Sequence, residues 1–369
     1  MKTRSIFLIF LMSLSLCSHG QTTGFYLYVG TYTTKGSEGI YMYRFDTRTG
    51  DATPVSIAKG IKNPSFLAIS PNQRYLYAAQ GIDGELVHAF AIDPQTRQLT
   101  LLNSESSAGV GPPHLEVDKT GNWVIVGNYR TGNLSVLPIR PDGSVGKAIQ
   151  TIQHEGTGPD PERQERAHVH SINIAPNNRD VFVPDLGIDK IMAYTFNDKT
   201  GQLAPAVSPF IATQPGSGPR HFTFHPNGRW AYVIQELSST ITGYLYQNGT
   251  LKPFQTVNTL PDGYTGRKWS ADVHISPDGR FLYGSNRAHE SLVIFRIDPK
   301  TGKLSYVGHQ DVMGKTPRNF LIDPTGRWVL VANQDTDNIV IFARDPDSGK
   351  LTPTGKEIIV SMPVCLKAL

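Results

Sequence analysis

Four basic or acidic side chains interrupt an otherwise uncharged polar pattern in the middle of the chain. Arg220 and Glu236 lie at the ends of one predicted hairpin, while His170 and Arg287 occupy the equivalent places about 50 residues before and after it. Arginines hold carboxylate or phosphate groups through paired hydrogen bonds and can stabilise an oxyanion. A neutral histidine is a suitable general base, and a nearby glutamate would orient it or the attacking water. These residues predict an anion-binding site that activates water, as in ester or lactone hydrolysis.

Four further side chains occupy similar positions and are predicted to contact the substrate. They are Asn128, Asp185, His221 and Arg318. The alternative is that polar side chains around a channel only interact with water and with free backbone groups. That alternative suits a single amide better than a charged side chain, because a ring of strands needs no charge at these points in order to fold.

No familiar motif for another kind of catalysis is present. The sequence has no Gly-x-Ser-x-Gly segment, no phosphate-binding glycine loop and no candidate cysteine nucleophile. His168 and His170 lie two residues apart, so a strand would point them the same way. A metal would still need a third ligand, such as His154 or Asp185, and the usual zinc spacings are missing. We therefore expect neither a metal nor another cofactor.

The hairpin that places Arg220 beside Glu236 is the clearest local pattern. Phe222 and Phe224 alternate with polar residues, as in a strand. The Pro-Asn-Gly sequence at 226–228 is typical of a tight turn, and an apolar strand follows it. The residue before the first strand and the residue after the second then lie at the same end, away from the turn.

The hairpin is one of several copies, and this repeat predicts the fold. Its turn occurs six times, at 71–74, 119–122, 176–179, 226–229, 277–280 and 324–327. A second turn has seven copies, marked by Gly50, Arg97, Gly143, Gly201, Gly249, Gly302 and Gly349. Two turns in each period of about 50 residues give four strands per unit, and such units repeated around an axis form a propeller. We predict an all-β, seven-bladed β-propeller with four-stranded blades.

The two ends of the chain are predicted to close the ring. The first unit lacks its opening turn and begins with the strand-like segment 26–29, while the strand-like tail 358–366 has no partner of its own. We predict that the tail pairs with the N-terminal blade, which hides an open sheet edge. An open solenoid is the alternative, but neither end has the polar cap that it would need. Large aromatic residues follow the first turn and are predicted to pack between blades: they are Tyr75, Trp123, Trp230, Phe281 and Trp328.

No second domain or linker interrupts the repeat, so residues 21–369 are predicted to form one domain. The longest insertion, 154–166, is polar and contains proline. We predict that it is a surface loop or lid over one mouth of the channel.

Residues 1–20 are predicted to be a signal peptide. A basic start precedes an apolar run that is too short to span a bilayer comfortably, and a cleavage region follows it. We therefore predict secretion across the inner membrane, into the periplasm, without stable membrane insertion. Lipidation of Cys17 is an alternative, although Leu16 is too bulky for that motif.

The composition excludes some classes of partner and of stabilisation. The formal net charge of +4 falls by two, to +2, once Lys2 and Arg4 are removed with the signal peptide, which argues against a nucleic-acid partner. The mature chain keeps one of the two cysteines, Cys365. It therefore has no internal disulfide, and its stability must come from packing. We make no prediction of the oligomeric state.

The sequence resembles the lactonase family of seven-bladed propellers, which includes 6-phosphogluconolactonases and fungal carboxy-muconate lactonizing enzymes. The resemblance runs from 26–32 to 363–366, and its most specific segments are 170–176 (HSINIAP), 185–189 (DLGID), 218–221 (GPRH), 236–237 (EL), 271–275 (ADVHI) and 286–287 (NR). It implies catalytic roles for His170, Arg220, Glu236 and Arg287, the residues that the repeat also selects. Many phosphogluconolactonase relatives are cytoplasmic, so the predicted signal peptide is a departure that leaves the choice of lactone open.

These observations predict a lactone hydrolase acting on a small anionic lactone or sugar acid. His170 would activate water with support from Glu236, and Arg220 and Arg287 would hold the anionic group and the developing oxyanion. Two alternatives are a lactonizing cycloisomerase, which adds no water, and a non-catalytic propeller that binds a glycan or a protein.

Overall fold

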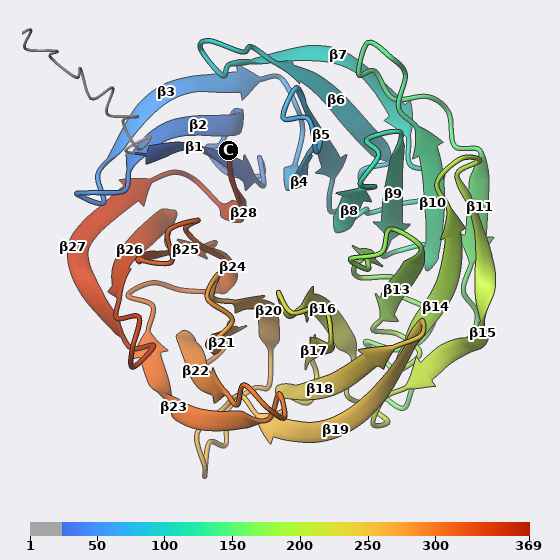
Figure 1. Cartoon of the computed structure of the whole chain (residues 1–369). Helices are drawn as coiled ribbons and strands as arrows, with labels where there is room; N and C mark the ends of the chain where they lie inside the picture. Colours follow the sequence, from blue (N-terminus) through green and yellow to red (C-terminus); the bar gives the residue numbers. More distant parts are fainter. Residues whose placement is uncertain (1–23) are drawn as a thin grey trace, which may run out of the picture.

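The computed structural model describes residues 24–369, which form 28 β-strands. The strands pair into seven four-stranded sheets that stand around a central axis as the blades of a propeller (Figure 1). This arrangement confirms the predicted all-β, seven-bladed fold. The predicted signal peptide, its cleavage site and Cys17 lie outside the described residues. Within the described part of the chain, no helix is long and apolar enough to cross a membrane.

The blades follow one another around the ring in chain order. The first three contain β1 (Gly24–Thr31), β2 (Gly39–Asp46), β3 (Ala52–Lys59), β4 (Pro64–Ile69), β5 (Tyr75–Gln80), β6 (Leu86–Ile92), β7 (Leu99–Ser106), β8 (His114–Val117), β9 (Trp123–Asn128), β10 (Asn133–Pro138) and β11 (Gln150–Gln153). The fourth and fifth contain β12 (Asn173–Ile174), β13 (Asp180–Asp185), β14 (Lys190–Asn197), β15 (Gln202–Ala212), β16 (Pro219–Phe224), β17 (Trp230–Gln235), β18 (Thr240–Gln247) and β19 (Thr250–Asn258). The last two contain β20 (Ser270–Ile275), β21 (Phe281–Asn286), β22 (Ser291–Ile297), β23 (Leu304–Asp311), β24 (Pro317–Ile322), β25 (Trp328–Asn333), β26 (Asn338–Arg344) and β27 (Leu351–Ile359).

The remaining strand, β28 (Pro363–Ala368), closes the ring. It is the innermost strand of the first blade, whose order is β28-β1-β2-β3. It pairs antiparallel with β1, with Leu27 opposite Ala368 and Gly30 opposite Cys365. The predicted pairing of the C-terminal tail with the N-terminal blade is therefore confirmed. This pairing joins the two ends of the chain and covers the inner edge of β1, which would otherwise be unpaired.

Inner-strand hairpins carry Arg220 and its counterparts to one end of the channel. In the fifth blade, Gly228 has a φ of +67°, which the tight turn between β16 and β17 requires. Pro219 pairs with Gln235, and the register shifts between Pro219 and His221, so Arg220 is the bulged residue. A bulge re-aims the side chain that it contains. Arg220 and Glu236 thus lie at the end of the hairpin opposite the turn, as predicted.

Aromatic side chains after the first turns pack against the neighbouring blade at five of the seven junctions. A Cβ atom added to Gly50, in the first blade, would come within 2.8 Å of the Trp328 ring of the last blade, and Trp328 Nε1 donates to the Thr47 carbonyl at 2.9 Å. The same contact recurs between Tyr75 and Gly143, Trp123 and Gly201, Trp230 and Gly302, and Phe281 and Gly349. The predicted inter-blade packing is confirmed, and the Trp328 contact joins the first and last blades a second time.

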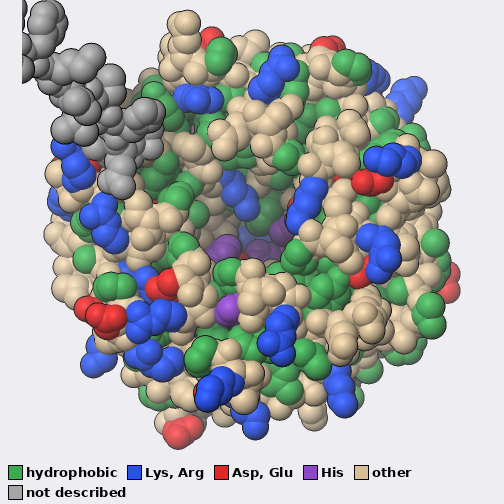
Figure 2. Space-filling view, in the orientation of Figure 1, with side chains coloured by type: hydrophobic (Ala, Val, Ile, Leu, Met, Phe, Trp, Pro, Cys, Tyr) green, Lys and Arg blue, Asp and Glu red, His purple; other side chains and the backbone are tan. Residues whose placement is uncertain are grey.

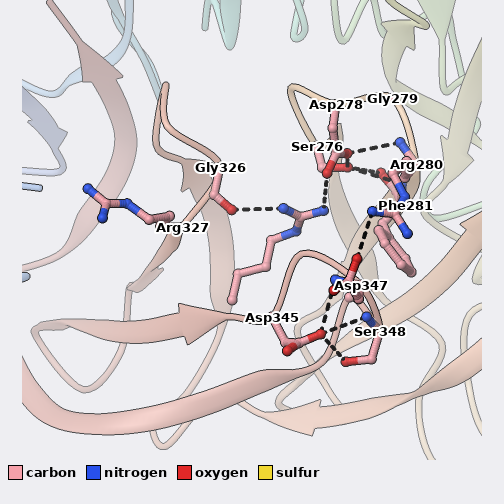
Figure 3. A network of polar contacts seen from close by, with 12 residues as sticks. Ser276, Asp278, Gly279, Arg280, Phe281, Gly326, Arg327, Asp345, Asp347 and Ser348 are labelled. Atoms are coloured by element: carbon pink, nitrogen blue, oxygen red, sulfur yellow. Dashed lines mark hydrogen bonds and ion pairs between the residues drawn. The ribbon is translucent and has the colours of Figure 1, made fainter.

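Polar contacts reinforce this packing where the last two blades meet (Figure 3). The buried Arg344 guanidinium donates to the Gly326 carbonyl at 2.8 Å, to Asp278 Oδ2 at 2.9 Å and to the Tyr283 hydroxyl at 2.9 Å. Three donors of one side chain therefore join turns that are far apart in the sequence, at the end of the ring opposite to Arg220.

Candidate active site

A pocket of about 390 Å³ opens at the channel mouth to which the inner-strand bulges point. Five arginines and one carboxylate line it, so its charge is strongly positive. The lining side chains used below are Tyr32, Tyr129, Arg163, His170, Glu236, Arg267, Trp269, Arg287 and Arg318. The space-filling view looks into the central channel from the opposite mouth, where the C-terminal strand ends, and shows histidine and basic side chains inside it (Figure 2).

Glu236 is the only carboxylate in the pocket lining, and three arginines surround it. Its oxygens lie 2.5 Å from Arg163 Nη2, 2.9 Å from Arg220 Nε and 2.7 Å from Arg287 Nη2. Burial opposes a charge on this carboxyl, but the guanidiniums of Arg287, Arg220 and Arg163 outweigh it and hold the pKa of Glu236 well below its usual range. Glu236 is therefore ionised and fixes the three arginines in place.

Arg220 is buried beneath the pocket. Its side chain is only 1% exposed, its Nε donates to Glu236, and its Nη1 donates to the Ala271 carbonyl at 2.6 Å. Burial lowers the pKa of Arg220 to about 10, which still leaves the group protonated at neutral pH. Arg220 does not line the mouth pocket, which differs from its predicted role of gripping the substrate there.

Arg287 and Arg318 present positive charge to the pocket in different ways. The Arg287 guanidinium lies 4.0 Å from the centre of the Trp269 ring, whose other neighbour is Arg267 at 4.2 Å. Arg318 lies 5.4 Å from the centre of the Tyr32 ring and forms no ion pair with any residue in the range 24–369. Arg318 is thus a charge in the pocket that a bound anion can neutralise.

His170 lies among these arginines and is 4% exposed. Burial, followed by the charge of Arg220 and of three other basic groups, holds the pKa of His170 well below its usual range, so the ring is neutral at neutral pH. Its Nδ1 is buried without a hydrogen-bond partner within the described chain. Its Nε2 has no partner there either but is not buried, and the ring lines the pocket. Nε2 is therefore the nitrogen that can act on a substrate.

The predicted support of His170 by Glu236 is not what the structure shows. Both oxygens of Glu236 are used by arginines, and no hydrogen bond joins this carboxylate to the His170 ring within the described residues. The carboxylate accepts hydrogen bonds from the three guanidiniums rather than from the histidine. The structure thus brings His170, Glu236, Arg287 and Arg318 to one pocket, with Arg220 directly below.

The remaining predicted site residues lie outside the mouth pocket. Asn128 donates to the Ser107 carbonyl at 3.1 Å. Asp185 binds His154 Nδ1 at 2.7 Å and accepts from the backbone nitrogen of His168 at 2.6 Å. Both side chains hold backbone segments or neighbouring side chains in place, which differs from the predicted contact with substrate. His221 lies deeper in the channel, where its Nδ1 is 2.7 Å from Asp272.

Three of the four residues that the sequence considered for a metal have other partners. His154 lies between Asp185 and the Tyr194 hydroxyl, at 2.7 and 2.8 Å. His168 contacts the Tyr129 carbonyl and Glu165. Within residues 24–369, no group of three or more histidine, cysteine or acidic side chains has the arrangement of a metal site.

Sequence reasoning missed several pocket residues, and three of them stand outside the repeat. Arg163 belongs to the 154–166 insertion, and Arg267 and Trp269 belong to the segment between β19 and β20. Arg163 Nη2 reaches Glu236 at 2.5 Å and the Tyr129 hydroxyl at 3.4 Å. The sequence offered one signal for Arg163, because this arginine lies in the insertion that was predicted to cover the mouth of the channel.

Comparisons with known proteins agree with this geometry. A family profile described as "Lactonase, 7-bladed beta-propeller" matches residues 26–368. A 6-phosphogluconolactonase of Formosa agariphila is 40% identical over 309 residues, which cover 80% of this chain and 86% of that protein. A 6-phosphogluconolactonase of Bacillus subtilis is 37% identical over 299 residues, covering 80% and 84%. The solved structure of a periplasmic gluconolactonase of Pseudomonas aeruginosa has a TM-score of 0.90 at 36% identity, covering 94% of this chain and 99% of its own.

Proposed function

The chain belongs to the lactonase family of seven-bladed β-propellers, and from this premise we propose that it hydrolyses a sugar lactone to the hydroxy acid. The relatives named 6-phosphogluconolactonase support this activity. The single observation that carries the proposal is the neutral ring of His170, whose open Nε2 shares one pocket with the guanidiniums of Arg287 and Arg318.

His170 acts as the general base. Its Nε2 takes a proton from water while the water oxygen bonds to the lactone carbonyl carbon, and negative charge develops on the carbonyl oxygen. Arg287 and Arg318 stabilise that charge in a pocket partly shielded from solvent. When the ring C–O bond breaks, the protonated His170 returns the proton to the departing oxygen. The products are the hydroxyl group and a carboxylic acid, which ionises.

The excess of positive charge favours an anionic lactone. Glu236 offsets one of the three arginines around it, and Arg318 has no acidic partner among the described residues. A phosphate or carboxylate on the substrate would supply the missing negative charge through paired hydrogen bonds. The Arg267 and Trp269 side chains at the rim provide a further cation and an apolar face beside it. We infer that a phosphorylated or otherwise anionic sugar lactone binds better than a neutral one.

We further propose that the chain acts in the periplasm. The pattern of residues 1–20 and the similarity to a periplasmic gluconolactonase of Pseudomonas aeruginosa support this location. Mass spectrometry of the protein recovered from the periplasmic fraction is expected to find an N-terminus near Gln21. Recovery of the chain only in the cytoplasm with Met1 present would refute the location without affecting the activity.

The proposed activity is tested with purified protein and a set of phosphorylated and unphosphorylated sugar lactones in heavy-oxygen water. Hydrolysis puts one heavy oxygen into the product carboxylate at a rate above the spontaneous one. Formation of an isomer without label would indicate a cycloisomerase. Tight binding of a glycan or protein that His170→Ala leaves unchanged, with no turnover of any lactone, would indicate a non-catalytic propeller.

A further inference from the structure

A second, much smaller cavity lies under the mouth pocket. Its volume of about 10 Å³ is that of a single water site. The side chains around it include Ser65, His170, Arg220, His221 and Arg318. It therefore lies between the proposed general base and the next histidine down the channel.

Two polar atoms of the cavity lining are buried without a hydrogen-bond partner in the described chain. They are His170 Nδ1 and Ser65 Oγ. A buried polar group without a partner destabilises the fold, so two such groups around one cavity point to a shared water molecule. A water site needs two to four polar neighbours, and these two residues already meet that condition.

His221 adds a third neighbour whose role is fixed by a carboxylate. His221 Nδ1 lies 2.7 Å from Asp272 Oδ1. Burial opposes a charge on Asp272, but His274 and His221 outweigh it and hold the pKa of Asp272 well below its usual range, so the carboxylate is an acceptor only. Nδ1 of His221 must then carry the hydrogen. Burial and then Arg220 lower the pKa of His221 to about 4, which leaves its Nε2 as a neutral acceptor.

Asp272 is held so firmly that it can serve as the fixed end of a chain of hydrogen bonds. Its Oδ2 accepts from Asn319 Nδ2 at 2.5 Å and contacts His274 Nε2 at 2.9 Å. Its Oδ1 also accepts from the backbone nitrogen of Val273 at 3.0 Å. The carboxylate therefore cannot turn away from His221 without losing several other contacts.

We propose that a water molecule in this small cavity links His170 to His221, and that the resulting chain Asp272–His221–water–His170 fixes the His170 proton on Nδ1. The water donates to His221 Nε2 and accepts from His170 Nδ1. Nε2 of His170, which faces the mouth pocket, is then always the unprotonated nitrogen. Asp272 and His221 are positioning residues, because they reach the substrate only through His170. The consequence for catalysis rests on the proposed lactone hydrolysis, whereas the tautomer itself does not.

Nitrogen NMR of protein labelled in its histidines tests the link directly. The spectrum of His170 is identified by its loss in His170→Gln. We expect the wild-type ring to carry its hydrogen on Nδ1. Asp272→Asn and His221→Phe are expected to give a mixture of tautomers, and Ser65→Ala a smaller change. His309→Gln is the matched control, since it removes a histidine from the outermost strand of a blade, where its Nε2 contacts the Thr259 carbonyl, and it should leave the tautomer unchanged.

Kinetics provide the second measurement. Loss of a partner that orients a reactive group typically costs about 10–100-fold, so Asp272→Asn and His221→Phe should lower kcat by that factor while KM stays within about twofold. His309→Gln should retain the wild-type kcat. Ser65→Ala removes only a hydroxyl, which keeps the test available if a larger change prevents folding.

The outcomes separate this link from the proposed function. An Nε2–H tautomer in the wild type, or a tautomer that Asp272→Asn, His221→Phe and Ser65→Ala all leave unchanged, overturns the link even if lactones are hydrolysed. The expected tautomers in a protein that hydrolyses no lactone would retain the link and refute only the proposed function.

Discussion

Arginine side chains around the pocket differ in what neutralises them. Arg163, Arg220 and Arg287 share Glu236, whereas Arg318 has only the face of the Tyr32 ring beside it. A paired guanidinium has already been satisfied by the protein, but an unpaired one gains a charge-assisted hydrogen bond when an anion binds. Arg318 should therefore contribute more to substrate affinity than Arg163 or Arg287, which Glu236 already neutralises.

Replacing Arg318 with alanine is expected to raise KM for an anionic lactone by about tenfold or more, since a hydrogen bond to a charged group is typically worth about 1.5–3 kcal/mol. Initial-rate kinetics measure the effect. Arg229→Ala is the matched control, because it removes the same charge from an exposed turn at the opposite mouth. Equal KM values for the two variants would show that Arg318 does not bind the substrate.

Glu236 is expected to stabilise the fold as well as the site. Glu236→Gln leaves buried arginines without their counter-charge and should lower the free energy of unfolding by about 3 kcal/mol or more. The folded-state pKa of this carboxyl is depressed from 4.5, so its contribution is complete above that pH and is lost as the pH falls below it. Chemical denaturation between pH 7 and 3 should therefore show a smaller acid-side loss of stability in the variant. An unchanged pH dependence would contradict this account.

The sequence predicted where the site residues lie along the repeat better than it predicted where their side chains point and what they contact. Comparing copies of the repeat identified His170, Arg220, Glu236 and Arg287, because charge at those points has no role in forming a blade. The bulge at Arg220 and the three-way competition for Glu236 have no signature in the sequence. For that reason Glu236 was predicted to support His170, whereas it binds arginines.

At the scale of elements, the bulges and the long insertion build the site. The inner strands β4, β16 and β24 shift register at Ser65, Arg220 and Arg318, which brings these side chains to the same end of the channel. The hairpin repeat predicted where each inner strand begins, because turn residues and alternating apolar residues mark it. The insertion 154–166 follows no repeat, so the contact of Arg163 with Glu236 could not be read from it.

The closing strand β28 can be monitored through Cys365. This cysteine is fully buried, its Sγ accepts from the Leu67 backbone nitrogen at 3.4 Å, and burial raises its pKa to about 11. It is the single cysteine among the described residues 24–369. A thiol reagent should therefore label the native protein very slowly, and labelling should accelerate in parallel with global unfolding.

Labelling that is fast under native conditions would contradict the closed ring. Tyr28→Phe is a suitable companion variant, since the Tyr28 hydroxyl donates to the Arg97 carbonyl of the next blade at 2.7 Å. It should destabilise the ring by about 1 kcal/mol and speed up labelling accordingly. Labelling that accelerates without loss of stability would show that β28 detaches on its own.

At the scale of the whole molecule, the closed ring brings residues of separate blades together in one site. Residues from all seven blades meet at one mouth only because the blades return to their starting point. The count of blades and the closure followed from the sequence, because the seven second turns count the blades and the unpaired tail supplies the strand that the first unit lacks. The charge of the mouth depended on side chains from loops as well as from the repeat.

The positive mouth should make activity on an anionic lactone sensitive to salt. Raising the ionic strength from about 0.01 M to about 1 M shortens the screening length from about 30 Å to about 3 Å. We expect kcat/KM for an anionic lactone to fall across this range, while kcat/KM for a neutral lactone of the same ring size stays nearly constant. A parallel response of both substrates would show that the arginines of the mouth do not attract the substrate.

The most direct test of the central claim compares the wild type with His170→Ala on one anionic sugar lactone at neutral pH. The claim is that the neutral His170 ring activates water in an arginine-lined pocket. We predict hydrolysis well above the spontaneous rate for the wild type, and a loss of about 10²–10⁴-fold in kcat for a variant that unfolds at the same temperature. A folded His170→Ala protein that hydrolyses the lactone as fast as the wild type would contradict the claim.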